Sequence, residues 1–358
     1  TKYRVISTDI PVPESLPQLE ELMKIESRSM HGAYPMIWKS AKNFQVEDYW
    51  GNKWLDFTST IFVANAGHAN EEVKKAIIDI VSKNLLAAYN YPTLERISFI
   101  KFLIENTPDF IEKAFLLSAG TETTEVALKL MRMWGQNIVP NKQAIICFDG
   151  NWHGRTLGAQ FMAGNKSQKE WVGFKDPLTY HLPFPYDNER SFKDDFYKMC
   201  LNNNLDPDSD IAGIMMETYQ GWGAYFYPDN YIKELVEIQK KHNILVSFDE
   251  MQSGFGRTGK LFGYMHYDIE PDIICCGKGA SSSLPLSMVL GRSELLDLPD
   301  VGSMSSTHSA HPIVCAAGEA NLKYILDNRL VEKSEELGQI LKNKLLDLSA
   351  ELKEKITI

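Results

Sequence analysis

The chain has 358 residues, of which 47 are acidic and 37 basic, and its formal net charge is −10. That length can bury a large core and leave a second, smaller domain. The negative charge gives no electrostatic basis for binding nucleic acid or an anionic membrane. No apolar run approaches the roughly 20 residues of a membrane span. The first residues carry charges and prolines where a signal peptide is apolar, so we expect a soluble protein.

The cysteines are five in number, an odd count, and they have no C-x-x-C spacing. We therefore expect no disulfide framework and a reducing, cytoplasmic compartment. The cysteines are Cys147, Cys200, Cys275, Cys276 and Cys315.

Short apolar runs alternate with longer amphipathic segments along most of the chain, which is typical of an α/β fold. Residues 44–58 predict a hairpin with its turn at 50–52, and residues 228–243 predict a helix that begins with a proline and ends in basic residues. Residues 320–356 predict one or two charged amphipathic helices. Five nearly continuous apolar runs predict parallel strands covered on both faces; they are residues 114–117, 144–148, 211–216, 244–248 and 273–276.

Polar residues follow each of the five predicted strands. In chain order they are the segments 118–121 and 149–153 and the residues Glu217, Asp249 and Lys278. Ligands of open parallel sheets bind at the carboxyl ends of the strands. We therefore expect these positions to converge on one crevice.

Gly120 and Thr121 stand where a small-residue loop enters a helix. Free N–H groups and the helix dipole make such an N-terminus a natural phosphate site, although an ordinary capped helix explains the same residues about equally well. The segment has no G-K-[ST], which argues against a nucleotide triphosphate.

Gly254, Gly256 and Gly259 form a G-x-G-x-x-G pattern after the strand 244–248. In a dinucleotide-binding unit the first glycine follows the strand directly and the third lies in the first turn of a helix. Here residues 249–253 intervene, and no helical apolar period follows. We therefore interpret the glycines as turn residues and keep an NAD-dependent oxidoreductase only as a minor alternative.

Asp249 and Lys278 are unusual for the ends of buried strands. A buried carboxylate needs a partner, either an Arg or Lys or the ring nitrogen of pyridoxal phosphate. Lys278 lies among small residues, and an amine in a partly desolvated pocket forms a Schiff base readily. A phosphate cradle, an aromatic residue, a carboxylate and a lysine, in that order, are the components of a pyridoxal phosphate site.

From about residue 44 to 325 the chain resembles the class III aminotransferases, the ornithine and 4-aminobutyrate group of fold type I pyridoxal phosphate enzymes. The resemblance rests on five ordered motifs, which are SAGTETTEVALKL, FDGNWHGRTLGA, FDEMQSGFGRTGK, CCGKGASSSLPLSMVL and SSTHSAHPIVCAAGEA. It implies a large domain with a mainly parallel central sheet flanked by helices, and a smaller α+β domain built from the chain ends. We expect residues 60–310 to form the large domain, and residues 1–59 with 311–358 to form the small one.

The resemblance also implies roles for single residues. Gly120 and Thr121 are expected to bind the cofactor phosphate, and Trp152 to stack on the pyridine ring. Asp249 is expected at the ring nitrogen and Gln252 at the phenolic oxygen.

Three further roles come from the same comparison with the family. Lys278 is expected to form the Schiff base and to shuttle the proton. In METYQGWGA, Glu217 matches the first acid of the family's E-P-x-Q-G-E-x-G and is expected to be a cofactor-binding residue. In SSTHSAHPIVCAAGEA, Thr307 is the expected phosphate ligand of a neighbouring subunit, which implies a homodimer. His308 and His311 lack a third ligand nearby, so no metal site is expected.

The chain departs from the family at three places. His311 stands where the family usually has Asn. Trp222 replaces the second acid of the E-P-x-Q-G-E-x-G motif, which in the ornithine enzyme partners a substrate-binding Arg near the C-terminus. The chain stops earlier than the family's small domain, so that Arg is not in view and we expect the small domain to be incomplete. Arg155 is a candidate for the substrate carboxylate.

We therefore expect a transaminase that moves an amino group from an amine or amino-acid donor to a keto-acid or aldehyde acceptor, through a Lys278 aldimine and pyridoxamine phosphate. Trp222 suggests a substrate with an apolar or sugar-like portion. An aminomutase, racemase or decarboxylase on the same cofactor is the main alternative, because the fold does not fix which bond is broken. A non-catalytic binding protein is a further one.

Overall fold

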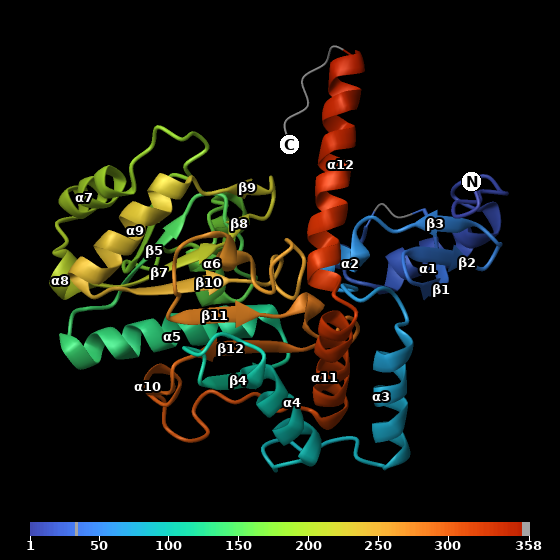
Figure 1. The fold of residues 1–358 in the computed structure, drawn as a ribbon, viewed down its shortest axis with the longest axis horizontal. Coiled ribbons are helices and arrows are strands. Elements are labelled where there is room, and N and C mark those ends of the chain that lie inside the picture. Colours follow the sequence, from blue (N-terminus) through green and yellow to red (C-terminus); the bar gives the residue numbers. More distant parts are fainter. Residues whose placement is uncertain (33–34, 353–358) are drawn as a thin grey trace.

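A computed structural model describes residues 1–32 and 35–352, and a seven-stranded sheet forms its centre (Figure 1). Strands are parallel to their neighbours from one edge, β6, as far as β11, whereas β12 is antiparallel to both β11 and β4. Across the sheet the order is β4 (Lys113–Leu117), β12 (Ser287–Gly291), β11 (Ile273–Cys276), β10 (Leu245–Asp249), β7 (Ile211–Glu217), β5 (Ala144–Phe148) and β6 (Thr179–Leu182).

All five predicted strands are present, as β4, β5, β7, β10 and β11, and the mainly parallel α/β fold is confirmed. The apolar patterns did not predict β6 and β12. The sequence of β6 is Thr-Tyr-His-Leu, which contains no apolar run, because this strand lies at the edge of the sheet. In β12 only Met288, Val289 and Leu290 are consecutive apolar residues, a shorter run than those that predicted strands.

Both faces of the sheet are covered, as continuous apolar strands require. Phe148 and Phe248 pack on one face with Leu235 of α9 (Asp229–His242), the predicted crossover helix. Cys147, the residue before Phe148, points to the other face and packs with Leu130 of α5 (Gly120–Ile138). Successive residues of a strand therefore belong to two separate cores.

The N-terminal residues form a separate three-stranded antiparallel sheet, of β1 (Trp38–Lys42), β2 (Gln45–Asp48) and β3 (Lys53–Leu55). The pair β2 and β3 is the hairpin predicted over residues 44–58, and β1 adds a strand that was not predicted. Asp48 fixes the hairpin turn, because its carboxylate accepts hydrogen bonds from the backbone N–H groups of Trp50 and Asn52, both at 2.9 Å.

Helices connect and cover these sheets. The α-helices besides α5 and α9 are α1 (Leu16–Ile25), α2 (Ser59–Phe62), α3 (Glu71–Ser82), α4 (Leu94–Glu105), α6 (Leu157–Met162), α7 (Phe192–Asn203), α8 (Pro207–Asp210), α10 (Ser293–Leu296), α11 (Pro312–Asp327) and α12 (Leu330–Leu352). The 3-10 helices are η1 (Pro13–Ser15), η2 (Arg28–Met30), η3 (Ser167–Val172), η4 (Gly263–His266) and η5 (Lys278–Ala280). A short hairpin pairs β8 (Tyr219–Gln220) with β9 (Tyr225–Phe226).

The helices predicted over residues 320–356 are the end of α11 and the whole of α12; residues 353–358 lie outside the described part. Leu322 and Ile325 of α11 are buried in the main core, whereas α12 extends away from the sheet (Figure 1). None of the helices in the described residues is both long and apolar enough to cross a membrane.

Gly256 and Gly259 confirm the interpretation of the G-x-G-x-x-G pattern as a turn. Both have positive φ, +87° and +86°, which glycine adopts without a steric cost. The segment after Asp249 is a series of turns rather than a helix. A Cβ at Gly256 would meet Val331 of α12, so the turn packs closely against that helix.

Candidate active site

The carboxyl ends of the central strands open into one cavity of about 650 Å³. Of the predicted site residues, nine line it; they are Gly120, Thr121, Trp152, Arg155, Glu217, Trp222, Asp249, Gln252 and Lys278. The tenth, Thr307, is exposed and is not among the lining residues. The structure therefore brings together the residues predicted for one subunit, as the strand topology requires.

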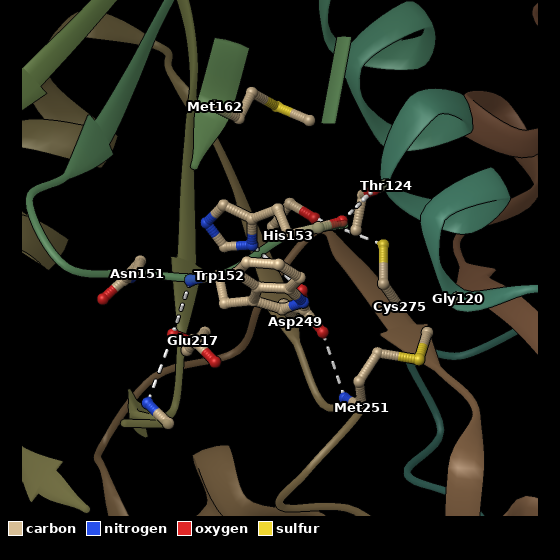
Figure 2. A network of polar contacts seen from close by, with 12 residues as sticks. Gly120, Thr124, Asn151, Trp152, His153, Met162, Glu217, Asp249, Met251 and Cys275 are labelled. Carbon is tan, nitrogen blue, oxygen red and sulfur yellow. Dashed lines mark hydrogen bonds and ion pairs between the residues drawn. The ribbon is translucent and has the colours of Figure 1, made fainter. Parts of the chain in front are cut away.

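Asp249 ends β10 at the base of this cavity and is only 4% exposed. One carboxylate oxygen lies 2.9 Å from Nδ1 of His153, and the other accepts a hydrogen bond from the backbone N–H of Met251 at 3.1 Å (Figure 2). Its side-chain partner within the described residues is thus a histidine rather than an Arg or a Lys.

His153 is a site residue that the sequence reasoning did not single out. It is 2% exposed, and its backbone carbonyl accepts a hydrogen bond from Thr124 of α5 at 2.7 Å. A buried histidine beside a carboxylate orients that carboxylate and completes its hydrogen bonding. Its position at the end of the segment 149–153 was the available signal.

Glu217 is the neighbour of Asp249 across the sheet, since the two are paired in the register of β7 and β10. Its Oε2 accepts hydrogen bonds from the backbone N–H groups of Trp152 at 2.9 Å and Gly221 at 3.3 Å (Figure 2). Burial, together with the charge of Asp249, raises the pKa of Glu217 to about 8. Glu217 is therefore mostly protonated at neutral pH.

The N-terminus of α5 forms another wall of the cavity. Gly120 is its first residue, and the first N–H groups of a helix have no intrahelical acceptor. The Glu122 carboxylate accepts from the N–H groups of Ser118 and Ala119, at 2.9 and 2.8 Å. That capping arrangement leaves the N–H groups of Gly120 and Thr121 for an anion.

Lys278 begins η5 directly after β11, with φ of 44°. Within the described residues its ammonium group has no hydrogen bond or ion pair, although its neighbours in the loop are buried. A Cβ at either Gly277 or Gly120 would meet the Met251 sulfur, so these glycines allow three loops to approach one another closely.

Aromatic side chains form the outer part of the cavity. The rings of Trp152 and Trp222 meet edge to face, with centroids 5.9 Å apart and an interplanar angle of 86°. The Arg155 guanidinium lies over the Trp152 ring, 4.8 Å from its centroid. Arg155 is exposed and has no ion-pair partner in the described part of the chain, which leaves its fork available to a ligand.

Comparison with known proteins identifies the family. The model of the aminotransferase class-III family matches residues 27–357. The chain belongs to the class III aminotransferases. A probable 4-aminobutyrate aminotransferase of Bacillus subtilis is 31% identical over 86% of this chain and 72% of its own length. Ornithine aminotransferase 2 of Staphylococcus aureus is 32% identical over 90% of this chain and 80% of its own length.

Solved structures agree with this family membership. An S-selective transaminase from an Arthrobacter species is 27% identical, with a TM-score of 0.83 over 94% of this chain and 77% of that one. A taurine:2-oxoglutarate aminotransferase from Bifidobacterium kashiwanohense, in complex with PLP and glutamate, is 25% identical, with a TM-score of 0.83 over 94% of this chain and 78% of that one. The chain is thus a fold type I transaminase that uses pyridoxal phosphate.

The residues in the cavity fit that cofactor. A buried carboxylate suits a protonated ring nitrogen, and an aromatic face suits the ring. A helix N-terminus suits a phosphate. The Lys278 side-chain nitrogen, which has no partner within the described residues, suits a bond to the cofactor's carbonyl carbon. All four groups line the same cavity.

Proposed function

We propose that Lys278 and Asp249 are the catalytic residues of this transaminase. The observation that carries the proposal is that an unpaired lysine and a buried, histidine-braced carboxylate line one cavity. Bound pyridoxal phosphate supplies an electron sink for the bond that breaks at the substrate's amino carbon. Asp249 keeps a proton on the cofactor's ring nitrogen, and the Lys278 amine, once free, carries the proton to and from that carbon.

The remaining residues bind and orient in this proposal. The N–H groups of Gly120 and Thr121 bind the cofactor phosphate, Trp152 stacks on the ring, and Gln252 donates to the ring oxygen. The position of Gln252 in the cavity lining supports this role, and its side-chain nitrogen lies 3.5 Å from the Gly221 carbonyl. Glu217 fixes the loop that carries Trp152 through the hydrogen bond at 2.9 Å.

We also propose that Trp222 selects substrates with an apolar or sugar-like portion. Its ring lies at the cavity edge and is 67% exposed, so a substrate can cover it. Arg155 binds a substrate or acceptor carboxylate beside it. The relatives carry names of two different substrates, ornithine and 4-aminobutyrate, so their names do not decide the donor.

A panel of amines tests this substrate class. We expect kcat/KM to be higher for apolar amines than for ornithine, and Trp222→Ala to lower it about 10-fold for the best apolar amine because the buried apolar contact is lost. Trp171→Ala is the control, since Trp171 is similarly exposed, at 69%, but lies outside this cavity. A strong preference of the unaltered enzyme for ornithine would overturn the proposal.

The organisation of the whole protein is proposed on the same basis. Residues 60–310 form the large domain, whose core also includes Leu322 and Ile325 of α11, and residues 1–59 with the rest of 311–358 contribute to a small one. A homodimer supplies Thr307 to the phosphate of the neighbouring site, and a cytoplasmic location suits the five cysteines, all of which are buried and free.

A further inference from the structure

The segment that joins the N-terminal sheet to the rest of the chain is a left-handed turn. Ser59, Thr60, Ile61 and Phe62, the residues of α2, have φ of 50°, 52°, 57° and 72°. L-residues avoid this region because Cβ approaches the following carbonyl oxygen, and for β-branched Thr60 and Ile61 it is a true outlier. Such a turn is stable only where several surrounding contacts hold its backbone in place.

One carboxylate braces the start of the turn. Asp56 accepts hydrogen bonds from the backbone N–H of Thr58 at 2.8 Å and from that of Thr60 at 3.1 Å. Its Oδ2 also lies 2.7 Å from Nε2 of His68. Burial alone would raise the pKa of Asp56, but these hydrogen bonds outweigh it and place the pKa below its ordinary value. The brace is therefore a charged carboxylate at neutral pH.

A second set of contacts ties the end of the turn to the loop that carries Lys278. The Arg257 guanidinium lies 5.6 Å from the centroid of the Phe62 ring, and it donates to the side chain of Asn65. That Asn65 side chain occupies the space that a Cβ at Gly279 would need. The left-handed turn and Lys278 are thus held in one packed unit.

The turn also forms part of the active-site wall. Ile61, Phe62 and Val63 line the same cavity as Lys278. We propose that Asp56 is a positioning residue of the active site, which holds α2 in its left-handed form so that Ile61 and Phe62 give the substrate cavity a fixed wall. The inference rests on the proposed function in assigning this cavity to the substrate.

Loss of the brace should act on substrate affinity more than on turnover. Without Asp56, the strained turn relaxes in a fraction of the molecules, and apparent affinity falls by that fraction. Thr60→Gly offers a rescue, because glycine adopts positive φ freely and the Thr60 side chain is exposed, with one hydrogen bond to the neighbouring Ser59 carbonyl.

The test compares four forms of the enzyme: unaltered, Asp56→Ala, Asp56→Ala with Thr60→Gly, and Asp48→Ala. Asp48 is the matched control, because it braces a turn of the same N-terminal sheet away from the cavity. For Asp56→Ala we expect KM for the amine donor to rise about 10-fold while kcat changes less than about 3-fold. Thr60→Gly should recover most of KM, and Asp48→Ala should leave KM unchanged.

Hydrogen exchange of the peptide 57–66 provides a readout that does not depend on activity. Asp56→Ala should speed exchange of these amides in the cofactor-free enzyme, and Thr60→Gly should slow it again. Faster exchange with an unchanged KM would contradict the positioning role while leaving the proposed function intact. An unchanged exchange rate in Asp56→Ala, or the same KM rise in Asp48→Ala, would also overturn the inference.

Discussion

The pairing of Asp249 with His153 explains how one residue can serve the cofactor. Asp249 is only 4% exposed, so the oxygens of its carboxylate need hydrogen-bond partners within the protein. Nδ1 of His153 lies 2.9 Å from one carboxylate oxygen, and the Met251 N–H donates to the other at 3.1 Å (Figure 2). These two contacts fix the orientation of the Asp249 carboxylate at the wall of the cavity.

Glu217 gives the cofactor-free protein a characteristic pH dependence. Burial and Asp249 raise the pKa of Glu217 to about 8. The folded protein therefore holds this proton more tightly than the unfolded chain does, and the stability that the proton contributes is lost as pH rises through 8. The free energy of unfolding, measured in urea, should fall by about 3 to 5 kcal/mol more for the unaltered protein than for Glu217→Gln between pH 5 and 9. Gln retains the acceptor for Trp152 but does not titrate.

The control for this measurement is Glu71→Gln, at an exposed glutamate in the first turn of α3. It should follow the unaltered protein across the whole pH range. If Glu217→Gln does so as well, Glu217 does not carry a raised pKa in the folded protein.

The elements differ in how well the sequence predicted them, and the reason is burial. Strands β5 and β11 match their predicted bounds because both faces are covered and every residue is apolar. The edge strand β6 lacks that pattern, and the apolar run of β12 is too short to predict a strand. No local rule predicts the left-handed α2, because Ser, Thr, Ile and Phe do not favour positive φ.

The site residues also differ in how well the sequence located them. Gly120, Asp249 and Lys278 could be located from strand ends and family motifs. The brace from His153 could not, because a hydrogen bond between residues 96 positions apart depends on how β10 and the loop after β5 meet in space. The Asp56 brace depends on packing in the same way, since it joins the N-terminal sheet to a turn at the cavity.

At the scale of the molecule, large apolar side chains are exposed on the segment between β3 and α4. Phe57, Tyr91 and Leu94 are 91%, 75% and 80% exposed, which suits a homodimer interface. Sedimentation should give twice the mass of one chain, and Leu94→Lys should shift it toward the monomer. Leu201→Lys is the control, because Leu201 is 82% exposed on α7 instead. A monomer for the unaltered protein would contradict the dimer.

The central claim is that Lys278 holds the cofactor, and its most direct test maps the bond chemically. The purified protein is loaded with pyridoxal phosphate, reduced with borohydride, digested and analysed by mass spectrometry. We expect the added mass on the peptide that contains Lys278, and none in Lys278→Ala, whereas Lys260→Ala, an exposed lysine outside the cavity, should behave as the unaltered protein. Stoichiometric attachment to any other lysine, or no attachment at all, would contradict the account.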